Sequence, residues 1–169
     1  MTTNDTNNRM NTGASENRRP LKLCFLCHGN ICRSPMAEFV MKELLRRADV
    51  DGVTVASAAM HTDEIGSDTH WGTRRKLTAE GVPFTPRAAW LLTAAKARAY
   101  DLLIGMDAYN KADLLRLVYP EDRAKVHLLL EFAGKSRDIA DPWYTGNFDE
   151  TYDDVVEGCT ALMERIAAK

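Results

Sequence analysis

The chain has 169 residues, of which 45% are apolar and 27% are charged, and this composition suits one globular domain with a single core. Its 22 basic and 24 acidic side chains give a net charge of −2, which excludes a strongly cationic binder of nucleic acid or membrane but not a local basic pocket. No apolar run approaches the roughly 18 residues that a membrane-spanning helix needs. Three of the four cysteines fall within nine residues, unlike a disulfide framework, so we expect a reducing, cytoplasmic compartment.

Residues 1–19 are rich in Asn, Thr, Ser and Gly and almost free of large apolar side chains. Such a segment cannot bury enough surface to offset the entropy lost on ordering, and it lacks the apolar run of a secretory signal. We therefore predict a disordered leader over residues 1–19 and one domain over residues 20–169.

From Pro20 onward, strand-like apolar runs alternate with segments of helical periodicity. The pattern predicts strands at 21–26, 53–56, 102–104 and 126–130, and helices at 34–48, 71–80, 87–99, 107–118 and 148–168, with Ser34 and Asp107 as N-caps. Alternation of this kind predicts an α/β fold: a single-domain three-layer sandwich with a central parallel four-stranded sheet and helices on both faces. In such sheets the ligand crevice lies beyond the carboxyl ends of the strands, where Cys27 follows the first one.

The loop that begins at Cys27 is the most informative stretch of the chain. Arg33 follows six positions later at the start of a helix, so the intervening backbone N–H groups can surround one small anion. That setting favours a cysteine thiolate acting as a nucleophile, and the planar fork of Arg33 can grip two oxygens of a tetrahedral oxyanion. Gly29 permits close approach of the backbone, and Asn30 tolerates left-handed geometry. We expect the Ser34 hydroxyl to donate to the Cys27 sulfur.

Cys24 and Cys27 also form a C-x-x-C pair, which is compatible with a redox or zinc site. Cys24, however, falls inside the apolar strand, and no second ligand pair follows it. We therefore interpret Cys24 as a core residue, and His28 as a loop residue rather than a metal ligand.

The stretch from Cys27 to Ser34 resembles the phosphate-binding loop of low-molecular-weight protein-tyrosine phosphatases, whose signature is Cys-x5-Arg-Ser near the N-terminus. The resemblance covers about residues 21–168. Its other pieces are Ser57-Ala58, the run Tyr100-Asp101-Leu102-Leu103-Ile104 with Met106-Asp107, and Asp141-Pro142-Trp143-Tyr144.

This resemblance implies a catalytic set of Cys27, Arg33 and Asp141, with Asp141 as the general acid that protonates the leaving oxygen. It implies phosphate binding and loop support by His28, Gly29, Asn30, Ile31, Cys32 and Ser34, an aromatic wall of Trp143 and Tyr144, and neither a metal nor another cofactor. In the family the second loop cysteine can form a reversible disulfide with the nucleophile, so Cys32 has that implied role beside the simpler one of loop packing.

Three departures from the family pattern bear on substrate preference. Ala59-Met60 stands where the family has Gly-Thr, and acidic Asp63-Glu64 replaces an aromatic residue on the pocket wall opposite Trp143. Trp71 lies too far along the chain to substitute for that aromatic, so we assign no binding role to residues 59–71. These changes predict a wider or more acidic rim and unchanged chemistry.

The main hypothesis is a phosphatase acting on phosphotyrosine-containing proteins through a phosphocysteine intermediate, with no nucleic-acid or membrane partner. A protein-arginine phosphatase is the close alternative, although members with that preference carry threonine where Ile31 stands. An arsenate reductase of the same fold would need two further cysteines in mid-chain, yet residues 33–158 contain none and Cys159 looks like core. A non-catalytic phosphate-binding module would need neither Cys27 nor Asp141.

Overall fold

The computed structural model describes residues 19–169. The predicted leader lies outside the described residues except for Arg19, whose guanidinium lies 2.6 Å from the Asp101 carboxylate. The elements are β1 (Leu21–Cys27), α1 (Arg33–Arg47), β2 (Val53–Ala59), α2 (Trp71–Ala79), α3 (Ala94–Ala97), β3 (Leu102–Gly105), α4 (Ala108–Leu117), β4 (Val126–Leu128), α5 (Pro142–Thr145) and α6 (Phe148–Ala167), with 3₁₀ helices at Pro120–Lys125 and Leu129–Ala133.

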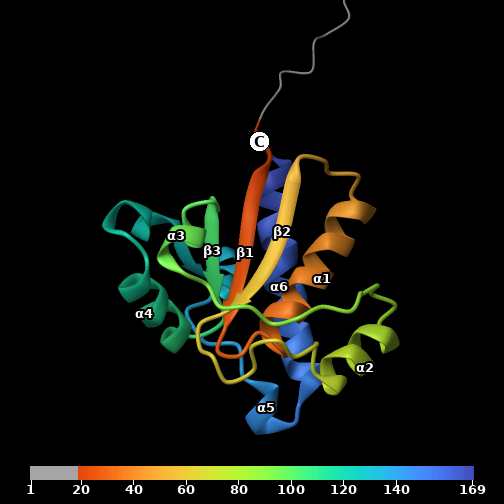
Figure 1. The fold of residues 1–169 in the computed structure, drawn as a ribbon. Helices are drawn as coiled ribbons and strands as arrows, with labels where there is room; N and C mark the ends of the chain where they lie inside the picture. Colours follow the sequence, from red (N-terminus) through yellow and green to blue (C-terminus); the bar gives the residue numbers. More distant parts are fainter. Residues whose placement is uncertain (1–18) are drawn as a thin grey trace, which may run out of the picture.

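The four strands form one parallel sheet in the order β2-β1-β3-β4, as the alternating pattern predicts. The chain first moves from β1 to β2 on one side and then crosses back to β3 on the other side of β1. The strand order therefore reverses between β1 and β3, and a crevice opens there at the carboxyl ends of the strands. Cys27 ends β1, and Figure 1 shows α2 and α5 at this same edge of the sheet.

The central strand β1 is buried on both faces because its side chains alternate between two clusters. Leu23 and Phe25 pack into the larger cluster with α1 and α6, whereas Cys24 and Leu26 pack into a second cluster with α3 and α4. Figure 1 shows these two helix pairs on opposite sides of the sheet. The predicted three-layer sandwich is therefore confirmed, and its alternation follows from the period of two along a strand.

The prediction of a helix over residues 87–99 is wrong for its first half, because α3 covers only Ala94–Ala97. The preceding segment is extended and runs beside the end of β2. Ala59 donates its N–H to the Trp90 carbonyl at 2.7 Å and accepts from the Leu92 N–H at 3.0 Å. Backbone pairing with a distant strand has overridden the local helical pattern here.

Two further local predictions need correction. The strand predicted over 126–130 ends at Leu128, where the chain turns into a 3₁₀ helix, and the four-residue α5 was not predicted at all. None of the helices within residues 19–169 is long and apolar enough to cross a membrane.

Two glycines let α6 pack closely against its neighbours. A Cβ atom built on Gly72 of α2 would lie 2.3 Å from the Phe148 ring, and one on Gly158 would lie 2.5 Å from the Leu129 side chain. Both separations are far below van der Waals contact. The absence of a side chain at these positions therefore permits the close packing of α6 against α2 and against the 3₁₀ helix at Leu129–Ala133.

Candidate active site

The loop after β1 is held by its carbonyl groups and leaves its N–H groups free. The His28 carbonyl accepts from the His61 N–H at 3.0 Å, and the Ile31 carbonyl accepts from the His70 N–H at 2.8 Å. Within the described part of the chain, the backbone N–H groups of residues 28–32 donate no hydrogen bond. Unpaired N–H groups gathered in one loop at a helix N-terminus form an anion cradle.

The Cys27 sulfur lies beside Ser34 at the bottom of this loop. Sγ is 3.0 Å from the Ser34 hydroxyl and 3.4 Å from the Ser34 backbone N–H, and both residues are almost completely buried. The predicted N-cap role of Ser34 is wrong, because α1 begins at Arg33 and Cys32 is its N-cap without a side-chain bond. The hydroxyl is instead directed at the sulfur, which it can solvate when the thiol is ionised.

Asn30 is fully buried and adopts the left-handed conformation, with φ of 59°. Its side-chain amide donates to the Ser34 hydroxyl at 2.8 Å and to the Ser57 hydroxyl at 3.0 Å. Ser57, one of the residues that carry the family resemblance, in turn donates to Glu38 at 2.7 Å. Asn30 therefore adopts the left-handed conformation that the sequence predicts it to tolerate. Its side-chain amide links the loop to α1 and to β2 by hydrogen bonds.

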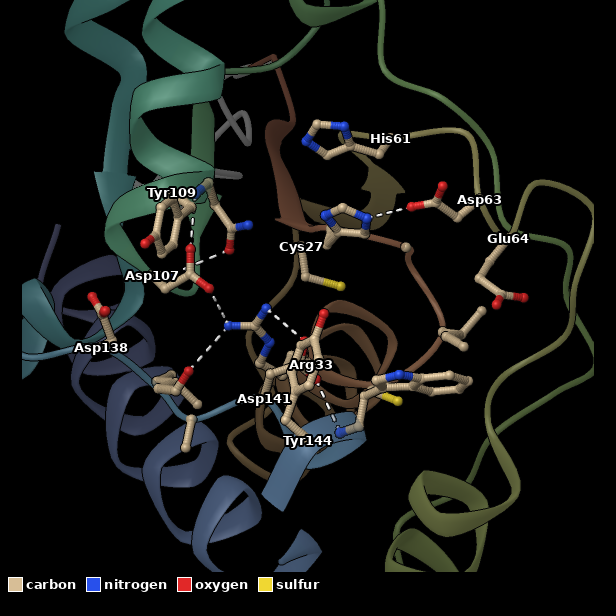
Figure 2. A pocket seen from close by; sticks show the side chains of 18 of the residues that line it. Cys27, Arg33, His61, Asp63, Glu64, Asp107, Tyr109, Asp138, Asp141 and Tyr144 are labelled. Carbon is tan, nitrogen blue, oxygen red and sulfur yellow. Dashed lines mark hydrogen bonds and ion pairs between the residues drawn. The ribbon is translucent and has the colours of Figure 1, made fainter. Parts of the chain in front are cut away.

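Arg33 lies between two carboxylates, as Figure 2 shows. One guanidinium nitrogen donates to Asp107 at 2.6 Å and to the Ile139 carbonyl at 3.1 Å, and another donates to Asp141 at 3.3 Å. Burial disfavours the charged form, but the nearby Cys27 and Asp141 and the bond to Asp107 outweigh it and raise the pKa of Arg33. A permanently cationic fork is thus held in the pocket in a defined orientation.

Asp107 has two functions, of which the sequence indicated one. It caps α4 as predicted, through Oδ1 and the Asn110 N–H at 2.8 Å, and its other oxygen holds Arg33. The signal that could have identified the second function is its position at the carboxyl end of β3, next to β1 in the sheet.

Asp141 begins the short helix α5, where Oδ1 accepts from the Trp143 N–H at 3.1 Å and Pro142 occupies the first helical position. Its second oxygen faces Arg33 in the pocket. Trp143 and Tyr144 follow directly and are 56% and 84% exposed. The Asp-Pro sequence therefore aims one carboxylate oxygen inward and places two aromatic side chains at the pocket mouth.

The other cysteines differ from Cys27 in their surroundings. Cys24 and Cys159 are fully buried core residues, as predicted. Cys32 is also buried, and loss of solvation, together with the neighbouring Cys27, raises the pKa of its thiol to about 12. All four cysteines are free thiols, and Cys32 is a neutral thiol at physiological pH.

These groups surround a cavity of about 750 Å³. We call the buried side chains beneath it the floor: Cys27, Asn30, Cys32, Arg33 and Ser34. We call the side chains around its mouth the rim: His28, His61, Asp63, Glu64, Tyr109, Asp113, Asp138, Trp143 and Tyr144. Figure 2 shows several of the rim residues facing one another across the opening.

The rim contains residues that the sequence did not identify. His28 pairs with Asp63, and its ring stacks on His61 with centroids 4.2 Å apart. His61 is bonded to Asp113 at 2.8 Å. From the sequence we assigned no binding role to residues 59–71, and the structure places His61, Asp63 and Glu64 of this segment along the cavity. No sequence motif places two histidines from different loops face to face.

The comparisons with known proteins agree with this geometry. A family model described as low molecular weight phosphotyrosine protein phosphatase matches residues 22–169. The chain belongs to this family. The low molecular weight protein-tyrosine-phosphatase PtpA of Staphylococcus aureus is 33% identical over 145 residues, which cover 85% of this chain and 92% of PtpA.

Two solved structures extend the likeness to the fold. YfkJ from Bacillus subtilis has a TM-score of 0.86 and 31% identity, and the match covers 90% of this chain and 98% of YfkJ. SP-PTP, a low molecular weight protein tyrosine phosphatase from Streptococcus pyogenes, has a TM-score of 0.77 and 36% identity, covering 86% of this chain and 93% of that protein. The three-layer sandwich of this chain is thus also the fold of these two proteins.

Proposed function

We propose that this phosphatase hydrolyses phosphotyrosine in proteins through a covalent phosphocysteine intermediate. The observation that carries the proposal is the floor, where free backbone N–H groups and the Arg33 fork surround the Cys27 sulfur, which lies 3.0 Å from the Ser34 hydroxyl. Such a floor suits a thiolate attacking a tetrahedral, doubly charged phosphoryl group.

In the first step, the Cys27 thiolate attacks phosphorus as the bond to the phenolic oxygen breaks. The N–H groups and Arg33 stabilise the charge on the three equatorial oxygens. Asp141, 3.3 Å from Arg33, transfers its proton to the departing phenolic oxygen.

In the second step, a water molecule attacks phosphorus and the sulfur–phosphorus bond breaks. The Asp141 carboxylate accepts the proton that this water loses, so the acid of the first step is the base of the second. The Ser34 hydroxyl stabilises the departing thiolate. Inorganic phosphate leaves, and Cys27 and Asp141 return to their initial states.

Trp143 and Tyr144 support an aryl substrate because they offer exposed aromatic surface directly after the acid. No metal is required in this mechanism, since Arg33 and the N–H groups supply the positive field that a metal ion supplies elsewhere. Activity that disappears on dialysis against a chelator and returns with zinc or magnesium would contradict this part of the proposal. The four free thiols support a reducing, cytoplasmic compartment.

Trapping the intermediate tests the nucleophile. Rapid acid quenching during turnover of p-nitrophenyl phosphate should leave one phosphoryl group on the peptide that contains Cys27, detected by mass spectrometry. In Cys27→Ser the serine hydroxyl is not ionised, so turnover should be abolished while vanadate still binds the intact cradle. Residual activity above about 1% would exclude Cys27 as the nucleophile.

A comparison of substrates tests the class. The kcat/KM for a phosphotyrosine peptide should exceed that for free phosphoarginine, because the rim presents aromatic side chains and the loop carries Ile31. A preference for phosphoarginine would leave the cysteine mechanism intact and assign the enzyme to the protein-arginine phosphatases.

A further inference from the structure

Arg87 reaches the floor from outside the pocket and binds Asn30 at two points. One guanidinium nitrogen donates to the Asn30 carbonyl at 2.8 Å, and another donates to the Asn30 side-chain oxygen. Arg87 lies on the extended segment beside β2, and Asp68 holds its backbone N–H at 3.2 Å. The two residues are 57 positions apart, and neither the catalytic loop nor the acid helix contains Arg87.

The contact from Arg87 decides which way the Asn30 amide points. A cation at the side-chain oxygen requires that the amide nitrogen face the other side, where it donates to Ser34 and Ser57. The Ser57 hydroxyl donates its hydrogen bond to the Glu38 carboxylate and so accepts the one from Asn30. Ser34 therefore accepts from Asn30, and its own proton is left for the Cys27 sulfur at 3.0 Å.

The same contact holds the shape of the loop. Asn30 is the one non-glycine residue of this loop with positive φ, a conformation that asparagine tolerates and that its side-chain hydrogen bonds hold in place here. Arg87 binds both its carbonyl and its side chain, so the backbone and the amide are oriented together. Burial lowers the pKa of Arg87, with Glu38 and Cys27 opposing, but an arginine remains cationic at physiological pH.

We propose that Arg87 is a positioning residue of the active site: through Asn30 it directs the Ser34 hydroxyl at Cys27 and so stabilises the thiolate. The inference rests on the proposed role of Cys27 as nucleophile. Arg87 does not line the pocket and touches no substrate, so it affects the chemistry through the hydrogen bonds of Asn30 and Ser34, with its charge adding a direct electrostatic contribution at Cys27.

The test measures the reactivity of Cys27 against pH. Iodoacetamide is uncharged and reacts with thiolates, and fragmentation of the tryptic peptide at residues 23–33 by tandem mass spectrometry distinguishes Cys27 from Cys24 and Cys32. In Arg87→Met the alkylation midpoint should move up by about one pH unit, with about tenfold slower alkylation on the acidic side. The acidic limb of kcat/KM should move by the same amount. Arg87→Lys keeps the charge but not the fork, so its shift should be smaller.

The control is Arg47→Met. Arg47 ends α1 and pairs with Glu43, about 20 Å along the helix from the loop, and its loss should leave the alkylation profile unchanged. Every variant retains the other charged groups around the network: Arg33 and Asp141 on the pocket side and Glu38, Lys42 and Asp68 on the outer side.

A double-mutant cycle with Ser34→Ala shows whether Arg87 acts through Ser34. If it does, Ser34→Ala alone shifts the midpoint, and adding Arg87→Met shifts it little further. The proposal would be overturned if the shift of the alkylation midpoint in the double variant equalled the sum of the shifts in the two single variants. An Arg87→Met protein that has a lower melting temperature and the wild-type alkylation profile would also overturn it, because that is the result of a purely structural contact.

If Arg87→Met does not fold, Arg87→Lys carries the test, and a wild-type profile in that variant overturns the proposal. The proposed function is judged separately. Alkylation needs no turnover, so a normal Arg87 effect on Cys27 in a protein without activity on aryl phosphates would contradict the proposed function and leave the positioning role supported.

Discussion

Cys27, Asn30 and Ser34 in the floor are at most 3% exposed, whereas Tyr109 and Tyr144 in the rim are more than 80% exposed. These three floor side chains are joined by hydrogen bonds, through the Asn30 amide and the Ser34 hydroxyl to the Cys27 sulfur. The rim is made of side chains from loops and from α4 and α5, and it includes exposed groups such as the pair of His28 and Asp63. Breaking a hydrogen bond of a buried polar network costs much free energy, whereas an exposed ion pair contributes little to stability. We therefore expect the floor to determine the reaction and the rim to adjust the substrate.

Among the variants that test this difference between floor and rim, we expect the largest loss of activity for a change at Asp141. In Asp141→Asn the proton donor is lost and the cradle stays, so kcat for phenyl phosphate should fall by ~10²–10⁴. The loss should shrink for phenols that are stable as anions, since they need no proton. Steady-state kinetics over a series of aryl phosphates measures this dependence.

Asp107→Asn is the comparison variant, because Asp107 orients Arg33 and does not face the leaving group in the mechanism. Its deficit should be the same across the series, and Asp153→Asn, an exposed change on α6, should show none. An Asp141→Asn deficit that is constant across leaving groups would make Asp141 a structural residue.

The next effect concerns the fork of Arg33. Arg33→Lys keeps the charge but cannot bind two equatorial oxygens or reach both Asp107 and Asp141. We expect kcat/KM to fall by ~10²–10³, as for the loss of a preorganised transition-state donor. A near-normal kcat/KM would mean that only the positive charge of Arg33 matters and not the geometry of its guanidinium group. The floor would then not differ from the rim in its need for a fixed orientation.

Oxidation by peroxide tests the role of Cys32, a floor residue for whose side chain we propose no contact with the phosphoryl group. Mild peroxide should convert the Cys27 thiolate to a sulfenic acid, which the Cys32 thiol traps as a disulfide with loss of water. Dithiothreitol should then restore most of the wild-type activity but much less of that of Cys32→Ala, whose nucleophile can proceed to sulfinic acid. Equal recovery of the two proteins would leave Cys32 with a packing role, in agreement with its burial.

The smallest effect is expected at the rim. Glu64→Gln removes one negative charge beside the path of a dianionic substrate. At low salt KM should fall by about two- to fivefold with kcat unchanged, and the difference should fade as ionic strength rises. Glu164→Gln, an exposed change at the end of α6, is the control. A change in kcat larger than in KM would show that the rim takes part in chemistry.

Local patterns in the sequence predicted several parts of this protein. The apolar run of β1, the glycine and asparagine of the next loop and the start of α1 are contiguous, so the spacing of Cys27 and Arg33 together with this local context predicted them as site residues. Alternating strands and helices specified the parallel sheet, because a strand buried on both faces has a distinctive composition. Asp141 was assigned through the family motif, and its contact with Arg33 agrees with that assignment.

Contacts between residues far apart in the sequence could not be predicted in this way and are known from the folded chain. Asp107 reaches Arg33 across 74 positions, and Arg87 reaches Asn30 across 57. Residues 87–93 were predicted as helix because periodicity reports the local chain, whereas their backbone pairs with the end of β2. His28 and His61 stack because two loops converge at one edge of the sheet. Such contacts depend on how elements pack in space, and hydrophobic periodicity carries information only about the face that each element buries.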